Sequence, residues 1–438
     1  MKVRLNERMK KFFKLKEHNV TVRSEILAAL TSFFAAVYII IVNANILSDG
    51  GIKVEPLIIA TVLSSAVGCL LVALISNTPL IIMPGMGINA LFTYTIINTL
   101  GLNYYQALAS VFISGVIFVI IALTPLSKSL IEAMPHNLKE SISIGIGVFI
   151  TFIGLQKSKI VVADTKALLK LGNITSPEVL AFIVIMIFTL VLFLKKVPGN
   201  FLISIITGTI ISIGFGIVDI SNIHYSMPNF NGYKDIFINL DFSAIGNIKF
   251  WISTFSLTLV LLFENIGMLH SQVSGMLNSP DKTSKALVAV SLSTIGCALC
   301  GASPSVSTVE GAAGITAGGK TGFTSVITGL LFLVSIFFIP LIALIPDAAL
   351  APILIIVGCL MAQNIRNLDF DDLSELFPCF ITIILMPLTY SIINGIAFGF
   401  ILYPICKLCC KKSNEVSVLR YATSFIFLLY FVANSLMH

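Results

Sequence analysis

The stretch "SPSVSTVEGAAGITAGGKTG", residues 303–322, decides the fold of this chain. It is rich in Gly, Ser and Thr and carries Glu310, yet it lies between two uncharged apolar runs, 286–302 and 323–346. A backbone that leaves helical geometry in lipid exposes N–H and C=O groups that cost several kcal/mol each. We therefore expect this stretch to be buried in protein or to line a cavity.

The apolar runs belong to a pattern that covers nearly the whole chain. The 438 residues are 57% hydrophobic and only 11% charged, whereas a soluble domain carries about 25% charged residues. Residues 56–127 contain no charge, and one membrane-spanning helix needs roughly 20 apolar residues. The short alternating segments of a transmembrane β-barrel are not seen in the sequence. The chain is therefore predicted to be an all-α polytopic membrane protein.

The apolar runs predict about fourteen membrane-spanning segments, some of them short or broken. Proline and glycine residues interrupt 378–410, which fits two short helices or one broken pair and leaves the count open by one. The candidate segments are 25–47, 55–76, 80–100, 105–126, 137–156, 177–195, 199–217, 250–275, 284–302, 304–318, 323–345, 349–364, 376–392, 394–410 and 418–436.

The two halves of the chain resemble each other in the order and spacing of their segments. "FFAAVYIIIVNANIL" (33–47) opens the first half and "FSLTLVLLFENIGML" (255–269) opens the second. A Pro-led stretch of small residues follows each opening segment by about forty residues, "MPGMGINALFTYT" (83–95) and "SPSVSTVEGAAGI" (303–315). Seven crossings per half would place the halves in opposite orientations. An inverted repeat with interrupted segments at matching positions is typical of secondary transporters.

The basic N-terminal tail, residues 1–24, indicates the orientation. Its eight Lys and Arg residues stand beside the first crossing, so the positive-inside rule predicts a cytoplasmic N-terminus and a multi-pass protein of the cell membrane. A nucleic-acid-binding arm is the alternative, but the neighbouring helix already accounts for the charge. Residues 25–217 then form the first repeat, 218–249 a polar extramembrane loop, and 250–438 the second repeat. Four lysines lie on the predicted outer side against the rule: Lys157, Lys159, Lys166 and Lys170.

The two interrupted segments are predicted to be short extended pieces, 80–84 and 304–308, each followed by a short helix. A proline in each stretch disfavours helix at the residue before it. The helices begin near Gly85 and near Val309, and their first turns expose free N–H groups and a positive dipole end. Groups around these helix starts are therefore candidates for binding a substrate. They are Gly87, Asn89, Thr308, Val309 and Gly311.

Two carboxylates are expected at membrane depth, Glu310 in the first turn of the second short helix and Glu264 within "LTLVLLFENIGML". An ionisable group there costs ~2.5–3.5 kcal/mol, so a functional role is favoured over simple helix capping. Two carboxylates in one low-dielectric cavity cannot both stay ionised cheaply, so one is expected to gain and lose a proton. This suits a proton-coupled carrier, and equally a site that holds a neutral ligand by its N–H donors.

Other polar and aromatic residues within crossings are weaker candidates. Asn89 is the strongest of them, because repeat symmetry places it opposite Glu310. Interhelical hydrogen bonding or ordinary packing is the alternative for all of them. No metal or other cofactor is expected, because Cys297-x-x-Cys300 lacks a second ligand pair. The remaining pocket or gate candidates are Phe263, Asn43, Tyr38, Thr389 and Asn394.

Four segments together carry a resemblance to a known family. "MPGMGINALFTYT", "LLFENIGML", "TVEGAAGITAGGKTGFTSV" and "NLDFDDLSELFPCFITIILMPLTYSIINGIAFGF" resemble the AzgA-type purine permeases, a branch of the nucleobase–cation symporters. The resemblance covers essentially the whole chain in order. It implies fourteen segments in a seven-plus-seven inverted repeat, divided into a core domain and a gate domain. The core would comprise 25–126 and 250–345, and the gate 137–217 and 349–436.

The resemblance also implies a function. Members of this branch import a purine base with a proton, bind it between the two broken segments and the eighth helix, and often form homodimers. Glu264 and Glu310 stand where the family has its two acids. Departures near the expected pocket, Leu261, Ala44 and Thr308, leave open whether the base is guanine, hypoxanthine or adenine.

Two other classes compete with a purine importer. An anion transporter of the same architecture would hold sulfate or bicarbonate at the paired helix starts, but two carboxylates would repel an anion there. A membrane-embedded enzyme would need a nucleophile–base pair or a metal site, and the sequence predicts neither at membrane depth. No enzyme activity is therefore expected.

Overall fold

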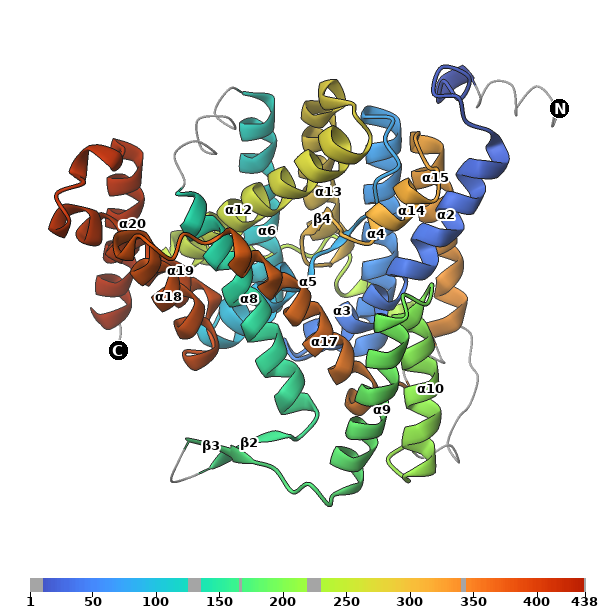
Figure 1. The fold of residues 1–438 in the computed structure, drawn as a ribbon, viewed down its shortest axis with the longest axis horizontal. Helices are drawn as coiled ribbons and strands as arrows, with labels where there is room; N and C mark the ends of the chain where they lie inside the picture. Colours follow the sequence, from blue (N-terminus) through green and yellow to red (C-terminus); the bar gives the residue numbers. More distant parts are fainter. Residues whose placement is uncertain (1–10, 125–134, 165–167, 219–229, 340–343, 437–438) are drawn as a thin grey trace.

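The computed structural model describes residues 11–124, 135–164, 168–218, 230–339 and 344–436 (Figure 1). Nine helices in these ranges are long and apolar enough to cross a membrane, and shorter apolar helices accompany them. The prediction of an all-α polytopic membrane protein is confirmed. The first half contains α2 (Val22–Ala36), α3 (Tyr38–Ser48), α4 (Val54–Ile75), β1 (Ile82–Pro84), α5 (Met86–Ala90), the π-helix η1 (Leu91–Thr99), α6 (Tyr104–Leu123), α8 (His136–Lys157), the hairpin β2 (Val161–Asp164) and β3 (Leu168–Leu171), α9 (Pro177–Leu194) and α10 (Asn200–Gly214).

The second half repeats this order. Short helices α11 (Asn231–Lys234) and η2 (Ser243–Gly246) lead into it. Its elements are α12 (Ile248–Leu269), η3 (His270–Met276), η4 (Pro280–Lys282), α13 (Thr283–Cys300), β4 (Ser305–Ser307), α14 (Gly311–Thr316), α15 (Gly322–Ser335), η5 (Ile336–Phe338), α17 (Asp347–Ala362), η6 (Gln363–Asn367), α18 (Leu373–Leu388), α19 (Ile392–Cys409), η7 (Ser413–Glu415) and α20 (Val418–Leu436).

The two broken segments meet at the centre of the molecule. Both extended pieces are present, and they pair with each other as antiparallel strands in which Met83 lies opposite Val306. All six strand residues are buried. The pairing satisfies backbone groups that would otherwise be exposed where the helices are interrupted.

The second short helix begins later than predicted. The N–H of Gly311 donates to the carbonyl of Thr308 at 3.1 Å, so a turn precedes α14 and the helix starts at Gly311 rather than near Val309. Glu310 therefore occupies the residue just before the helix, not its first turn. Its side chain is free of a capping bond to that helix.

Equivalent helices of the two halves make equivalent contacts. Helix α4 packs against α15 as α6 packs against α13, and α8 packs against α18 as α17 packs against α9. The central contacts, α4 with α13 and α8 with α17, each join a helix to its own counterpart. Two groups result: the first group is α2–α6 with α12–α15, and the second group is α8–α10 with α17–α19 (Figure 1). Whether these groups move as core and gate domains stays a prediction.

Small residues allow the closest of these crossings. A Cβ added at Gly358 of α17 would lie 2.3 Å from the carbonyl oxygen of Gly147 in α8. A Cβ at Gly322 of α15 would lie 2.5 Å from the carbonyl oxygen of Ala73 in α4. Apolar side chains give no hydrophobic advantage over lipid, so close backbone approach supplies much of the packing energy between membrane helices.

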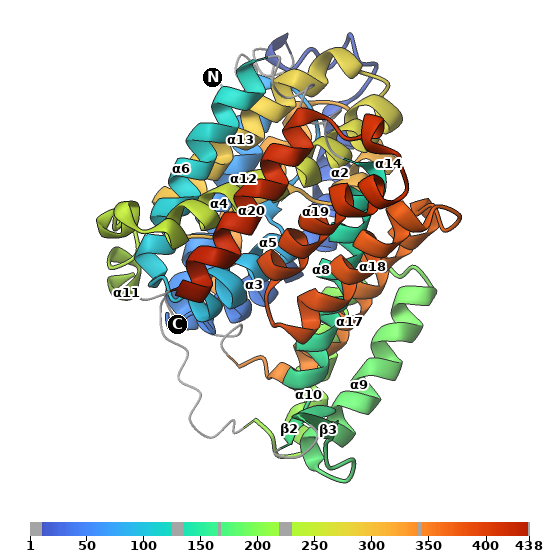
Figure 2. The same cartoon turned by 90° about the vertical axis from the view of Figure 1, so that its left-hand side faces the viewer.

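The region left open in the sequence, 378–410, consists of two helices. Its prolines lie inside α18 and α19, where neighbouring helices can compensate the lost backbone bond. Helix α20 is therefore additional to the seven-plus-seven order. It packs against α19 and α12 (Figure 2), and Phe427 of α20 contacts both Phe400 and Phe255.

Candidate functional site

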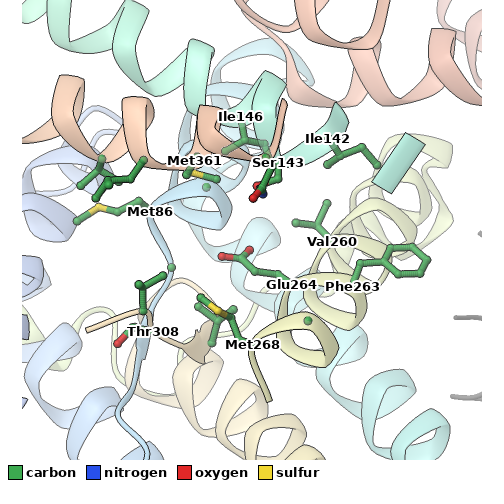
Figure 3. Close-up of a pocket in the computed structure, with 18 of the residues that line it drawn as sticks. Met86, Ile142, Ser143, Ile146, Val260, Phe263, Glu264, Met268, Thr308 and Met361 are labelled. Carbon is green, nitrogen blue, oxygen red and sulfur yellow. The ribbon is translucent and has the colours of Figure 1, made fainter. Parts of the chain in front are cut away.

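A cavity of about 760 Å³ lies between the two groups, beside the paired strands (Figure 3). Its walls come from α12 and the two broken segments on one side, and from α8, α10, η6, α17 and α19 on the other. Both carboxylates expected at membrane depth, Glu264 and Glu310, line it. The cavity is mostly apolar elsewhere, which fits a site for a small organic ligand.

Glu264 projects from α12 into this cavity. Figure 3 shows its carboxylate directed toward the chain at the β1–α5 junction. A Cβ at Gly85 would lie only 3.4 Å from Glu264 Oε1 and 2.6 Å from Val306 Cγ2, so only glycine leaves this space free. Within the described ranges no protein group forms a hydrogen bond with the Glu264 carboxylate. It is therefore available to a ligand.

Glu310 differs, because a protein group already holds it. The hydroxyl of Tyr38, the first residue of α3, donates to Glu310 Oε1 at 2.5 Å. Tyr38 itself is fully buried and does not line the cavity. The two acids thus share one cavity but have different partners.

Four other predicted residues reach the cavity: Gly87, Phe263, Thr308 and Val309. The ring of Phe263 points away from the Glu264 carboxylate in Figure 3. Val309 is 62% exposed in the cavity wall. Thr308 Oγ1 is buried without a hydrogen-bond partner among the described residues.

Two of the predicted backbone donors are occupied by the protein itself. The N–H of Thr308 donates to the carbonyl of Ile81 at 3.1 Å, and the N–H of Gly311 donates to the carbonyl of Thr308. The strand pairing and the turn before α14 account for both bonds. Gly311 is buried outside the cavity lining, so the expectation that these two groups donate to a substrate is corrected.

Asn89 and Asn43 do not line the cavity. Asn89 Oδ1 accepts a hydrogen bond from Ser303 Oγ at 2.6 Å. Asn43 Nδ2 donates to Thr61 Oγ1 at 2.8 Å. Both side chains therefore join neighbouring segments, as the alternative of interhelical hydrogen bonding predicts, and neither lines the cavity that contains Glu310.

Thr389 and Asn394 also lie outside the cavity lining. Thr389 is the residue after α18, and its hydroxyl donates to the carbonyl of Leu385 at 2.7 Å. Asn394 belongs to the first turn of α19, where its N–H donates to Ser391 Oγ. The break between α18 and α19 places these residues at the far end of the helices, away from the carboxylates.

Polar residues of α8 line the cavity without having been predicted. They are Lys139, Glu140 and Ser143, and Ser143 Oγ accepts a hydrogen bond from Asn364 Nδ2 at 2.9 Å. Lys139 and Ser143 are four residues apart and so share a helix face. The sequence does not show which face of α8 meets α12. In the sequence alone, these residues therefore look like the ordinary polar end of a membrane helix.

Residues 23–398 match the permease family Xan_ur_permease. The nucleobase transporter PlAzg2 of Paenibacillus larvae is 44% identical over 382 residues, which is 87% of this chain and 76% of that protein. The guanine/hypoxanthine permease PbuO of Bacillus subtilis is 38% identical over 95% of this chain and 99% of its own.

Solved structures with a similar fold are transporters. The transmembrane domain of the cyanobacterial bicarbonate transporter BicA has a TM-score of 0.68 at 19% identity, covering 86% of this chain and 97% of that one. SLC26A9 has a TM-score of 0.66 at 11% identity, covering 90% of this chain and 66% of that one. At these identities the likeness concerns the fold alone. The family match over most of the length, together with relatives above 30% identity, shows that the chain belongs to the Xan_ur_permease family of membrane permeases.

Proposed function

We propose that this protein imports a purine nucleobase (guanine, hypoxanthine or adenine) across the cell membrane. The observation that carries the proposal is an unpartnered carboxylate, Glu264, in a largely apolar cavity between two helix groups, in a chain whose relatives are named for transport of these bases. The adenine permease AdeQ of Escherichia coli is a further relative, 30% identical over 96% of this chain.

The chemistry of the cavity suits a flat base with N–H donors. A carboxylate accepts paired N–H groups in charge-assisted hydrogen bonds, which are stronger than neutral ones. Met86, Met268 and Met361 line the same space (Figure 3), and their flexible thioethers pack well against flat rings. A volume of about 760 Å³ lies within the usual range of small-molecule sites.

Alternating access is the proposed mode of transport. The cavity extends from the two carboxylates to Lys139, near the start of α8, and to Asn367, at the end of η6. With the proposed cytoplasmic N-terminus, this end faces the cell interior. Movement of one group against the other would then expose Glu264 to the outside, with a proton as the proposed coupling ion. The homodimer stays a prediction.

Uptake of radiolabelled guanine, hypoxanthine and adenine tests the proposal, in cells that lack other purine carriers. We expect saturable accumulation that a protonophore abolishes, and no accumulation by Glu264→Gln. Glu55→Gln is the matched control, because Glu55 is exposed at the start of α4. Full uptake by Glu264→Gln, or accumulation that follows a sodium gradient instead, would contradict the site or the coupling ion respectively.

An anion transporter remains the second candidate, because the structural neighbours include a bicarbonate transporter. A thermal-shift panel of purines, pyrimidines, bicarbonate and sulfate on purified protein separates the two. Stabilisation by a purine alone supports the proposal. Stabilisation by an anion alone would replace it.

A further inference from the structure

The residue that holds Glu310 stands at a break between two helices. Helix α2 ends at Ala36 and α3 begins at Tyr38. The phenol ring lies inside the protein with no exposed surface, and its hydroxyl reaches Glu310 at 2.5 Å. This distance is within the usual range of an O–H···O hydrogen bond.

The same ring touches the second group of helices. Phe201, near the start of α10, meets the Tyr38 ring edge-on with centroids 4.8 Å apart. Phe201 also stacks on Phe193 of α9 at 5.9 Å and lines the cavity. Tyr38 is therefore in contact with an acid of its own group, Glu310, and with Phe201 of the other group.

We propose that Tyr38 is a positioning residue that fixes Glu310 for the substrate and links this acid to the position of α10. One carboxylate oxygen of Glu310 accepts from Tyr38, and Glu310 lines the cavity proposed for the ligand. When α10 moves away from the first group, Phe201 loses its contact with the Tyr38 ring. The ring whose hydroxyl bonds to Glu310 is then held less firmly. The inference rests on the proposed purine transport and deepens it.

A comparison of Tyr38→Phe with Tyr104→Phe tests the role of the Tyr38 hydroxyl. Tyr38→Phe keeps the ring and its contact with Phe201 but removes the donor. A tenfold change in affinity corresponds to about 1.4 kcal/mol, a size that the loss of one hydrogen bond at a buried carboxyl group reaches. We expect the KM for the purine to rise about tenfold or more, with Vmax per folded transporter within about twofold of wild type.

Tyr104→Phe is the matched control. Tyr104 is also buried in the first group, but its hydroxyl donates to the backbone carbonyl of Gly301 at 2.8 Å. We expect this variant to lower the melting temperature without changing KM. Phe201→Leu tests the other contact, and we expect it to lower Vmax.

A double variant separates positioning from a general structural role. If Tyr38 acts through Glu310, purine binding by Tyr38→Phe with Glu310→Gln will be no weaker than by Glu310→Gln alone. An unchanged KM in Tyr38→Phe, the same loss in both backgrounds, or a Tyr38→Phe protein that does not fold would overturn the inference and leave the proposed function intact. Absence of purine uptake by the wild type would overturn both.

Discussion

The boundary between the two helix groups is open at one end and closed at the other. At the open end lies the cavity with Glu264. At the closed end, Lys157 at the end of α8 bonds to Asp49, just after α3, at 3.2 Å, and to Asp347 at the start of α17 at 3.3 Å. The hydroxyl of Tyr94 donates to the same Asp49 carboxylate at 2.7 Å. An ion pair across the boundary therefore closes it.

Aromatic contacts complete the closed end. Tyr390, between α18 and α19, meets Tyr94 of the first group at 5.5 Å and Phe149 of its own group at 5.3 Å. The N–H of Ile392 donates to Thr95 Oγ1 at 3.0 Å. The comparison shows that a small set of polar and aromatic contacts joins the groups at this end. The proposed alternating access would require these contacts to break.

The largest expected effect comes from making the closed end permanent. In a background without native cysteines, Asp49→Cys with Lys157→Cys joined by a short thiol cross-linker should reduce purine uptake to background, because the groups can no longer separate there. A reducible cross-linker should allow recovery. The control joins Lys159→Cys to Glu178→Cys, since this ion pair at 2.8 Å lies beside α8 and α9 of one group. Undiminished uptake by the cross-linked Asp49–Lys157 variant would show that this end does not open.

A second prediction concerns a lysine whose partners all lie in the C-terminal part of the chain. Lys407 of α19 is 1% exposed and bonds to Glu415 at 2.6 Å and Glu375 at 2.7 Å. Removing one partner from a buried ion pair costs about 3–5 kcal/mol. We expect Lys407→Met to cost about the lower figure, because Glu415 is half exposed, and to lower the melting temperature strongly. Thermal unfolding in detergent measures it. An unchanged melting temperature would contradict a stabilising role for Lys407.

Lys157→Met should act on conformation more than on stability. Partly exposed ion pairs contribute up to about 1 kcal/mol, which corresponds to a few-fold change in population. We expect the open-end cavity to become less accessible, because separation at the closed end becomes easier. The rate of thiol labelling at Ser143→Cys reports this, and it should fall a few-fold. Labelling at the wild-type rate would indicate that Lys157 does not hold the closed end.

The smallest expected effect is a pH dependence at the start of α18. Lys412 bonds to Asp372 at 2.7 Å and holds the pKa of that carboxyl well below its usual range. The stability that this bond contributes is present above the ordinary aspartate pKa of about 3.9 and is lost as pH falls through the lowered value. We expect a small fall in melting temperature on acidification that is weaker in Asp372→Asn. Asparagine keeps the helix cap, so an equal fall in both proteins would contradict the assignment.

Much of the architecture could be predicted from the chain, because lipid imposes simple demands. Long uncharged runs must be helices, and Pro84 and Pro304 marked where the helix had to be interrupted. That the two interrupted pieces pair with each other could not be predicted, because the pairing depends on how segments far apart in the chain cross in space. The same holds for Tyr38 and Glu310, which are separated by 272 residues.

The partners of two charged residues near helix ends also could not be predicted from the sequence. Glu25 is fully buried and accepts hydrogen bonds from Thr321 Oγ1 and Thr324 Oγ1, both at 2.7 Å, at the start of α15. Lys157, which is predicted to lie on the outer side against the positive-inside rule, has two acidic partners, Asp49 and Asp347. In each case the partner residue lies on another segment, and neither spacing nor composition identifies it.

The β1–β4 pairing also constrains how this chain could change. Each half supplies one strand of a two-stranded ribbon that is only three residues long. Its register is fixed, with Ile82 opposite Ser307. Insertion of one residue into either strand would turn its side chains to the opposite face and displace the short helix that follows. The two halves are therefore not free to diverge separately at these positions, and two polypeptides made by cutting the chain between its halves would each lack one edge of the central ribbon until they reassembled.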